Sequence, residues 1–300
     1  GGYVGGEIQG RLKSGGYFVV EADEFDRSFL KIYPNAAVVT TIDAEHLDSY
    51  GDEAGVKSGF VEFLNRLPFY GQAVLGGESP GVREILPQLP RPYPIYGLDS
   101  ESRFYPRNVK HRSWGSDFEL YDADELLGQV ELNVPGEHNL LNAVGAASLT
   151  VLLGIAREHA VEGLRRFSGL DRRFEYKGQV GDMLIVDDYA HHPTEVRATL
   201  ATARSFGRRV TAVFQPHLYS RTRDFYRDFA TALATADQVM IAGIYPAREA
   251  PIADVNSGMI VREMRANGFD AVEFEEDANR LLARIIEWSR AGDLILTMGA

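Results

Sequence analysis

The pattern of hydrophobic and polar positions changes near residue 170, and the second half of the chain has the more regular pattern. Short apolar runs alternate there with stretches of helical periodicity. The pattern predicts strands at 183–187, 209–214, 237–242, 271–274 and 293–297, and helices at 194–206, 222–235, 258–267 and 277–290. Strands that alternate with helices are typical of a doubly wound parallel sheet, so we predict a Rossmann-like α/β domain at 170–300.

The pattern of residues 1–169 is less regular, and it predicts a second α/β domain there. Apolar runs predict strands at about 17–21, 37–42 and 72–76, and a β-rich stretch follows at about 93–134. Two helices close this half, one from Asn139, a good N-cap, to Leu153 and one at about 157–167. We find no internal repeat.

Composition and charge narrow the class of protein. The 300 residues are 45% hydrophobic and 25% charged, which suits two ordinary globular domains. The formal net charge is −12 and Lys and Arg do not gather into a long basic face, so duplex nucleic acid is not an expected partner. The chain has no cysteine, which excludes disulfides and thiolate sites and suits a reducing cytoplasm. Its apolar runs are shorter than the ~18 residues of a membrane helix.

The stretch from Asp187 to Val196 carries the densest chemistry in the second half. Asp187 and Asp188 end an apolar run, His191 and His192 follow in a turn, and Pro193 opens the next helical pattern. Polar groups are thereby held at the carboxyl end of a strand, which is where α/β enzymes place their sites. Paired carboxylates and imidazoles also suit a metallohydrolase, and that alternative stays open on the pattern alone.

Two acidic clusters follow predicted strands of the first half. Residues 21–26 hold four carboxylates, a density that suits a cation such as Mg²⁺, although a solvated acidic loop fits as well. Residues 43–48 combine acids with His46. If the two strands are neighbours, Glu21 and His46 lie within reach of one metal and phosphate site.

A fourth cluster, at 215–224, follows the strand predicted at 209–214. It contains His217 and Arg221, and Arg173 lies at the junction of the two halves. The planar guanidinium of Arg suits a carboxylate or phosphate ligand, whereas a salt bridge at a helix start is its commoner role.

Taken together, these strings resemble the Mur ligases, and the similarity extends over nearly the whole chain. The matching strings lie at 20–24, 28–30, 41–48, 135–143, 172–174, 187–196, 214–217 and 221–224. Within the family they are most similar to the members that join L-alanine to UDP-N-acetylmuramate. The order and spacing of the strings carry the resemblance, since each string is weak alone.

The resemblance implies ATP-driven amide formation. In that chemistry the muramate carboxylate attacks the γ-phosphate of ATP, and the amine of L-alanine then displaces phosphate from the acyl phosphate. The resemblance implies a partial central ATP-binding domain followed by the Rossmann-like domain, with Mg²⁺ to neutralise phosphate charge. By the resemblance, Glu21 binds one Mg²⁺ and His46 binds a second. The residues implied to contact the nucleotide are His138, Asn139, Asn142, Arg173 and Asp188. Those implied to contact the acyl phosphate or the amino acid are His191, His217 and Arg221, and the expected catalytic residues are His46, His191 and Arg221.

The chain also departs from the family pattern. A Gly-Lys-Thr phosphate loop is absent from residues 1 to 300, and Leu218 stands where some relatives carry Arg. Both ends suggest a fragment, so we expect the isolated chain to be inactive. Two alternatives stay open: a murein peptide ligase, which shares most motifs, and a nucleotide-binding module without catalysis.

Overall fold

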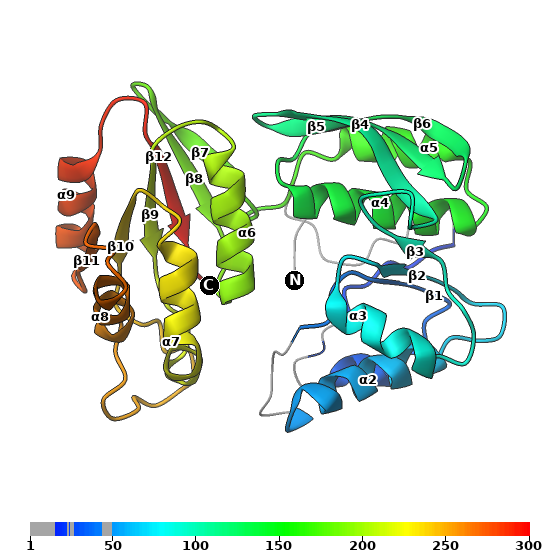
Figure 1. The fold of residues 1–300 in the computed structure, drawn as a ribbon, viewed down its shortest axis with the longest axis horizontal. Helices are drawn as coiled ribbons and strands as arrows, with labels where there is room; N and C mark the ends of the chain where they lie inside the picture. Colours follow the sequence, from blue (N-terminus) through cyan, green and yellow to red (C-terminus); the bar gives the residue numbers. More distant parts are fainter. Residues whose placement is uncertain (1–15, 23, 25–26, 44–49) are drawn as a thin grey trace. The chain divides into compact units, whose positions relative to one another are not determined.

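The computed structural model describes residues 16–22, 24, 27–43 and 50–300 (Figure 1). The chain divides into two compact units, residues 1–168 and 169–300. None of the helices in the described part of the chain combines the length and apolar character that crossing a bilayer requires.

The described residues of the first unit form a six-stranded sheet in the order β1-β2-β3-β4-β5-β6. Its strands are β1 (Ala36–Val39), β2 (Gln72–Gly76), β3 (Ile95–Tyr96), β4 (Phe104–Arg112), β5 (Gly115–Asp122) and β6 (Glu125–Leu132). Pairing is parallel from β1 to β4 and antiparallel from β4 to β6. The β-rich stretch predicted at 93–134 therefore forms four strands: β3 and β4 extend the parallel part of the sheet, and β5 and β6 add antiparallel strands.

Helices cover both faces of this sheet. Its helices are η1 (Ser28–Lys31), α2 (Glu53–Asn65), α3 (Pro80–Ile85), η2 (Leu86–Gln88), α4 (Glu137–Leu152) and α5 (Arg157–Arg166). Successive side chains of a strand point to opposite faces. Ala37 and Val39 accordingly join the core under η1, α2 and α3, whereas Val38 packs in the core under α4 and α5 (Figure 1).

The second unit contains a six-stranded sheet in the order β11-β10-β9-β12-β8-β7. Its strands are β7 (Glu175–Val180), β8 (Met183–Asp188), β9 (Val210–Phe214), β10 (Gln238–Ile241), β11 (Val272–Phe274) and β12 (Leu294–Met298). All neighbours pair in parallel except β7, which is antiparallel to β8. Because β12 returns between β9 and β8, the chain reverses its direction of winding there, and ligands of such sheets bind at this switch point.

The helices of the second unit cover both faces of its sheet. They are α6 (Pro193–Arg204), α7 (Tyr219–Leu233), α8 (Gly258–Ala266) and α9 (Ala278–Trp288). Phe214 meets Phe229 of α7 at 5.0 Å between ring centroids, whereas the adjacent Val213 packs with residues of α9. Adjacent strand residues face opposite ways, so α7 and α9 cover opposite faces (Figure 1). The predicted doubly wound α/β fold is confirmed.

Some predicted elements were wrong. Tyr17 to Glu21 form no strand and pair with no strand of the described sheet, and Val19 is 73% exposed. An apolar run makes a strand only where a neighbouring strand accepts its hydrogen bonds. Gly136, not Asn139, is the N-cap of α4, because its φ of 99° lets the chain turn three residues earlier. The edge strand β7 was not predicted.

Candidate active site

The neighbouring carboxylates at the end of β8 have different surroundings. Asp188 is 6% exposed and accepts hydrogen bonds from the amides of Phe174 (2.7 Å) and Ala190 (2.8 Å) and from the Thr199 hydroxyl (3.1 Å). Burial raises the pKa of the Asp188 carboxyl, while these donors counteract part of the rise. Asp188 therefore fixes the turn that leads from β8 to α6.

Asp187 lies on the opposite face of β8. Its carboxylate accepts a hydrogen bond from the Thr297 hydroxyl (2.6 Å) and pairs with Arg172 at 3.2 Å. Its environment is thus polar and half-buried. The two acids and two imidazoles of the 187–192 stretch do not converge, and no group of three possible metal-ligating side chains occurs among the residues that the structure describes. This geometry disfavours the metallohydrolase alternative.

The amino end of α6 holds both histidines of the stretch in place. His192 is the N-cap, and its Nδ1 accepts from the amide of Thr194 (3.4 Å). Glu195, the third helical residue, accepts in return from the amides of His191 (2.9 Å) and His192 (3.2 Å). This reciprocal pair is a capping box, which satisfies amides that the helix itself leaves without partners.

The loop between β9 and α7 brings a third histidine beside His191. The rings of His191 and His217 lie 5.7 Å apart at 83°, and the ring of Tyr245 stacks on His217 at 5.8 Å. Arg221, in the first turn of α7, donates from Nη1 to Nδ1 of His217 (3.3 Å). The three residues that the sequence predicted as substrate contacts in this half, His191, His217 and Arg221, therefore form one cluster.

The loop after β10 closes over the amino end of α7. The amide of Tyr245 donates to Pro216 and the amide of Leu218 donates to Tyr245, so the two loops run side by side. The Glu249 carboxylate accepts from the amide of Ser220 (3.0 Å) and from its hydroxyl. Burial opposes the charge of Glu249, but these donors hold the pKa of its carboxyl below the ordinary value.

Burial shifts the protonation of the cluster towards neutral rings. Burial lowers the pKa of His191. The charge of Glu195 raises this pKa in part, and the charge of Arg221 lowers it further. Burial, Arg221 and His191 together lower the pKa of His217 to about 4. Burial alone raises the pKa of the Glu195 carboxyl, but His191, neighbouring amides and Arg173 bring it below its ordinary value. Near pH 7 the site thus holds neutral imidazoles beside a cation and a carboxylate.

Two arginines at the start of the second unit gather around one aromatic ring. The guanidinium groups of Arg172 and Arg173 lie 4.9 Å and 5.6 Å from the ring centroid of Tyr189. Arg173 is exposed and lies 3.8 Å from Glu195, at the edge of the histidine cluster. Its predicted contact with a nucleotide stays a prediction.

The candidate residues of the first unit lie at one helix end and in one irregular segment. His138 and Asn139 occupy the first turn of α4, and Asn142 is exposed one turn later. The Asn139 side chain donates to the carbonyl of Pro135 (2.7 Å), which ties the helix to the turn before it. Glu21 is exposed, and His46 lies outside the described residues.

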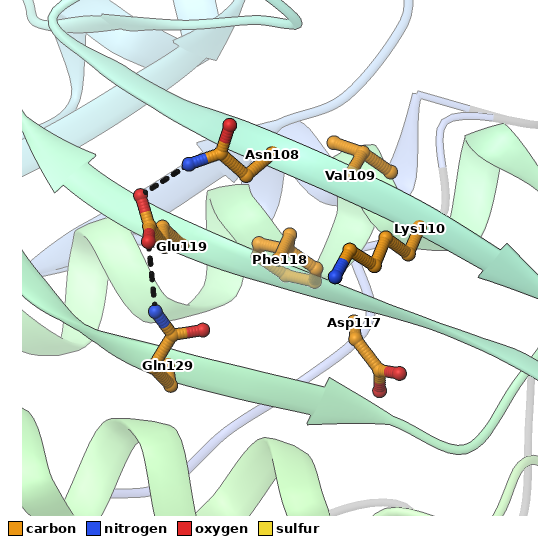
Figure 2. Close-up of a pocket in the computed structure, with 7 residues that line it drawn as sticks. All are labelled: Asn108, Val109, Lys110, Asp117, Phe118, Glu119 and Gln129. Carbon is orange, nitrogen blue, oxygen red and sulfur yellow. Dashed lines mark hydrogen bonds between the residues drawn. The ribbon is translucent and has the colours of Figure 1, made fainter.

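A shallow hollow on the outer face of β4, β5 and β6 belongs to neither group of candidates. Figure 2 shows Glu119 between Asn108 and Gln129, each of which donates to it at 2.9 Å. These contacts pair neighbouring strands across the sheet surface. No predicted site residue lines the hollow, and we assign it no function.

Sequence reasoning missed three contributors to the cluster: Glu195, Tyr245 and Glu249. Glu195 had a detectable signal, because a carboxylate three residues after an N-cap predicts a capping box. Tyr245 and Glu249 gave no such signal. Only the pairing of the two loops brings them to His217 and Ser220.

Comparison with known proteins agrees with this architecture. The Mur ligase middle domain matches residues 10–150, and the Mur ligase, glutamate ligase domain matches residues 172–300. The UDP-N-acetylmuramate–L-alanine ligase of Geotalea daltonii is 40% identical over 291 residues, which are 97% of this chain. The chain belongs to the Mur ligase family. It spans 64% of the length of that relative.

Solved structures show the same fold. The UDP-N-acetylmuramate–alanine ligase of Thermotoga maritima aligns with a TM-score of 0.73 and 24% identity, over 94% of this chain and 60% of that chain. The MurF ligase of the same organism in complex with ADP aligns with a TM-score of 0.71 and 18% identity, over 91% of this chain and 60% of that chain.

Proposed function

We propose that this chain forms the middle and C-terminal domains of an ATP-dependent UDP-N-acetylmuramate–L-alanine ligase of peptidoglycan synthesis. The observation that carries the proposal is the cluster of His191, His217 and Arg221 at the carboxyl edge of the second sheet. A relative that carries this name is 40% identical over 97% of the chain, which supports the choice within the family.

Arg221 is the proposed partner of the L-alanine carboxylate. Its guanidinium presents a planar set of donors that fits a carboxylate with two parallel hydrogen bonds. The imidazoles beside it are neutral, so Arg221 supplies the positive charge for the proposed carboxylate and uncharged nitrogen atoms lie near the proposed reacting centre. This arrangement suits capture of an acyl phosphate by an amine.

Each unit contains residues that are proposed to contact the nucleotide. Arg173 is exposed and is proposed to contact ATP, and His138, Asn139 and Asn142 are proposed to line the adenine side at the start of α4. The donors described for Asp188 all lie within its own unit, so we propose that it acts by holding the β8–α6 turn. The ADP bound to the MurF relative supports a nucleotide site in this fold.

Mg²⁺ is the cofactor that the family resemblance suggests. Glu21 offers an exposed carboxylate, the ligand type that Mg²⁺ prefers, and His46 lies outside the described residues. The described residues therefore fit the metal at one position. When bound, Mg²⁺ neutralises phosphate charge during transfer.

The amine substrate separates this proposal from a murein peptide ligase. We expect the complete ligase that contains this chain to release phosphate from ATP only when UDP-N-acetylmuramate and an amine are both present, with L-alanine at least ten times better in kcat/KM than glycine or a tripeptide. Preference for the tripeptide indicates the recycling enzyme. Nucleotide binding without turnover on any amine indicates a binding module.

A further inference from the structure

The Nδ1 atoms of His191 and His217 have hydrogen-bond partners of opposite kinds. Nδ1 of His191 lies 2.8 Å from the carbonyl oxygen of Tyr189 and 3.5 Å from a carboxylate oxygen of Glu195. Both oxygen atoms only accept hydrogen bonds, so this Nδ1 carries the proton and donates. In the neutral ring, Nε2 of His191 then holds the lone pair.

His217 has the other tautomer. Its Nδ1 lies 3.3 Å from Nη1 of Arg221, and a guanidinium only donates. Nδ1 of His217 therefore accepts, and Nε2 of the neutral ring carries the proton. Two perpendicular rings 5.7 Å apart thus present different atoms: a proton acceptor on His191 and a hydrogen-bond donor on His217.

Both rings are neutral at pH 7, which each tautomer requires. The charged and titratable groups that face them come from four segments: Arg173 before β7, Tyr189 and Glu195 around the start of α6, Arg221 in α7, and Tyr245 and Glu249 after β10. Glu195 and Glu249 favour the imidazolium forms, but burial and Arg221 outweigh them, and the pKa of His217 falls to about 4.

We propose that the two histidines divide the work of amide formation, with His191 as proton acceptor and His217 as hydrogen-bond donor, and that Glu195 is a positioning residue that fixes His191 in its tautomer. The inference rests on the proposed ligase function. The amine nitrogen, once its ammonium form has lost a proton to solvent, bonds to the acyl carbon, and a further proton of that nitrogen passes to Nε2 of His191. The bond from that carbon to the phosphate oxygen then breaks, phosphate leaves with the electron pair, and it receives the proton from His191.

The division of roles fits the basicity of each group. A nitrogen that has just bonded to the acyl carbon carries positive charge and is strongly acidic, so a weakly basic imidazole is sufficient to accept its proton. Nε2–H of His217 donates to the oxygen that becomes negative in the tetrahedral intermediate. Arg221 fixes the His217 tautomer as well as binding carboxylate.

Glutamine substitutions separate the two roles. The side-chain amide of Gln supplies an N–H near the position of Nε2 but accepts no proton at neutral pH. We expect His191→Gln to lower kcat of the complete ligase about 100-fold or more, and His217→Gln to lower it less than about 10-fold. Equal losses, or a larger loss for His217→Gln, overturn the assignment.

Nitrogen-15 NMR of the 300-residue chain labelled at histidine tests the tautomers without any activity. The chain has seven histidines, and the His191→Gln and His217→Gln variants assign the two signals by their loss. We expect His191 to be protonated at Nδ1 and His217 at Nε2 at pH 7. The same tautomer in both rings, or an imidazolium in either, contradicts the proposal, whereas failure of ligation with the expected spectra contradicts only the proposed function.

Glu195→Gln tests the positioning role. It retains an oxygen that accepts from the amides of His191 and His192 but removes the charge that favours imidazolium in His191. We expect kcat to fall about 10-fold with KM for L-alanine nearly unchanged, and the acidic limb of the pH profile to move to lower pH. An unchanged limb shows that Glu195 serves only as a helix cap.

Discussion

Each edge of the second sheet holds an arginine with a different kind of partner, an acid at the amino edge and a histidine at the carboxyl edge. At the amino edge, Arg209 before β9 pairs with Asp293 before β12 at 3.0 Å, and the Asp293 side chain is 3% exposed. At the carboxyl edge, Arg221 donates to a neutral imidazole. The comparison indicates that the amino-edge pair stabilises the fold, whereas Arg221 and the two neutral rings at the carboxyl edge are the groups proposed to bind a ligand.

The largest effect is expected at the amino edge. Asp293→Ala leaves the half-buried Arg209 without its acidic partner, so we expect the free energy of unfolding to fall by about 3 kcal/mol. Denaturant unfolding measures the loss, and the matched control is Asp182→Ala. Asp182 is 65% exposed in its pair with Arg208, so its loss is expected to stay within about 0.5 kcal/mol. Similar losses for both variants contradict the structural role of Asp293.

At the carboxyl edge, loss of Arg221 is expected to weaken the binding of L-alanine. Arg221→Ala removes the proposed carboxylate partner, and we expect KM for L-alanine to rise about 30- to 100-fold while stability changes by less than about 1 kcal/mol. Steady-state kinetics of the complete ligase measure the rise. Arg223→Ala is the control, because the Arg223 side chain is about half-exposed and pairs with the adjacent Asp224. A comparable rise in KM for the Arg223→Ala control contradicts the proposed role of Arg221 in binding the L-alanine carboxylate.

The neutral state of His217 makes stability depend on pH. Its folded pKa of about 4 lies below the ordinary value of 6.5, so the folded state binds fewer protons than the unfolded state between these values. The stability that this ring contributes is therefore full above pH 6.5 and is lost as pH falls towards 4. We expect the wild type to lose about 1–2 kcal/mol more than His217→Gln between pH 7 and 4.5. If the free energy of unfolding falls equally with pH in the wild type and in His217→Gln, the ring of His217 does not contribute this pH dependence.

The smallest expected effect is the loss of stability when a carboxylate that caps a helix is removed. Glu195 caps α6 beside the histidines, and Asp277 caps α9 by accepting from the amides of Asn279 and Arg280. Either residue replaced by Ala is expected to cost about 1 kcal/mol in thermal or chemical unfolding. Only Glu195→Ala is expected to lower kcat. If Asp277→Ala lowers kcat equally, the change reflects general loosening of the domain.

The fold of the second unit was predictable because its pattern is periodic and its strands are buried. The alternation of apolar runs and helical stretches gave every parallel strand to within a few residues. Strand β7 was not predicted because it is a largely exposed edge strand with a glycine at 178. Its hydrogen bonds to β8 define it, and its side chains show no buried pattern. In the first unit, Tyr17 to Glu21 has strand composition but no described strand partner.

Three residues of the cluster were predicted from the sequence, but their contacts and the other three members were not. The position of His191, His217 and Arg221 after buried strands indicated one edge of the sheet, and the structure brings them together. The tautomers depend on a carbonyl oxygen and a guanidinium that reach each Nδ1 only in the folded chain. The nucleotide contact that the family resemblance implies for Asp188 stays a prediction, and its buried hydrogen bonds tie it to its own turn.

Oxygen-18 transfer tests the central claim most directly, which is that a carboxylate is activated by phosphate and captured by an amine at the carboxyl edge. UDP-N-acetylmuramate labelled with oxygen-18 in its carboxylate is incubated with ATP, L-alanine and the complete ligase, and the released phosphate is analysed by mass spectrometry. We predict one labelled oxygen in each phosphate, formed together with one amide. Phosphate without label, at the same yield of amide, contradicts the account.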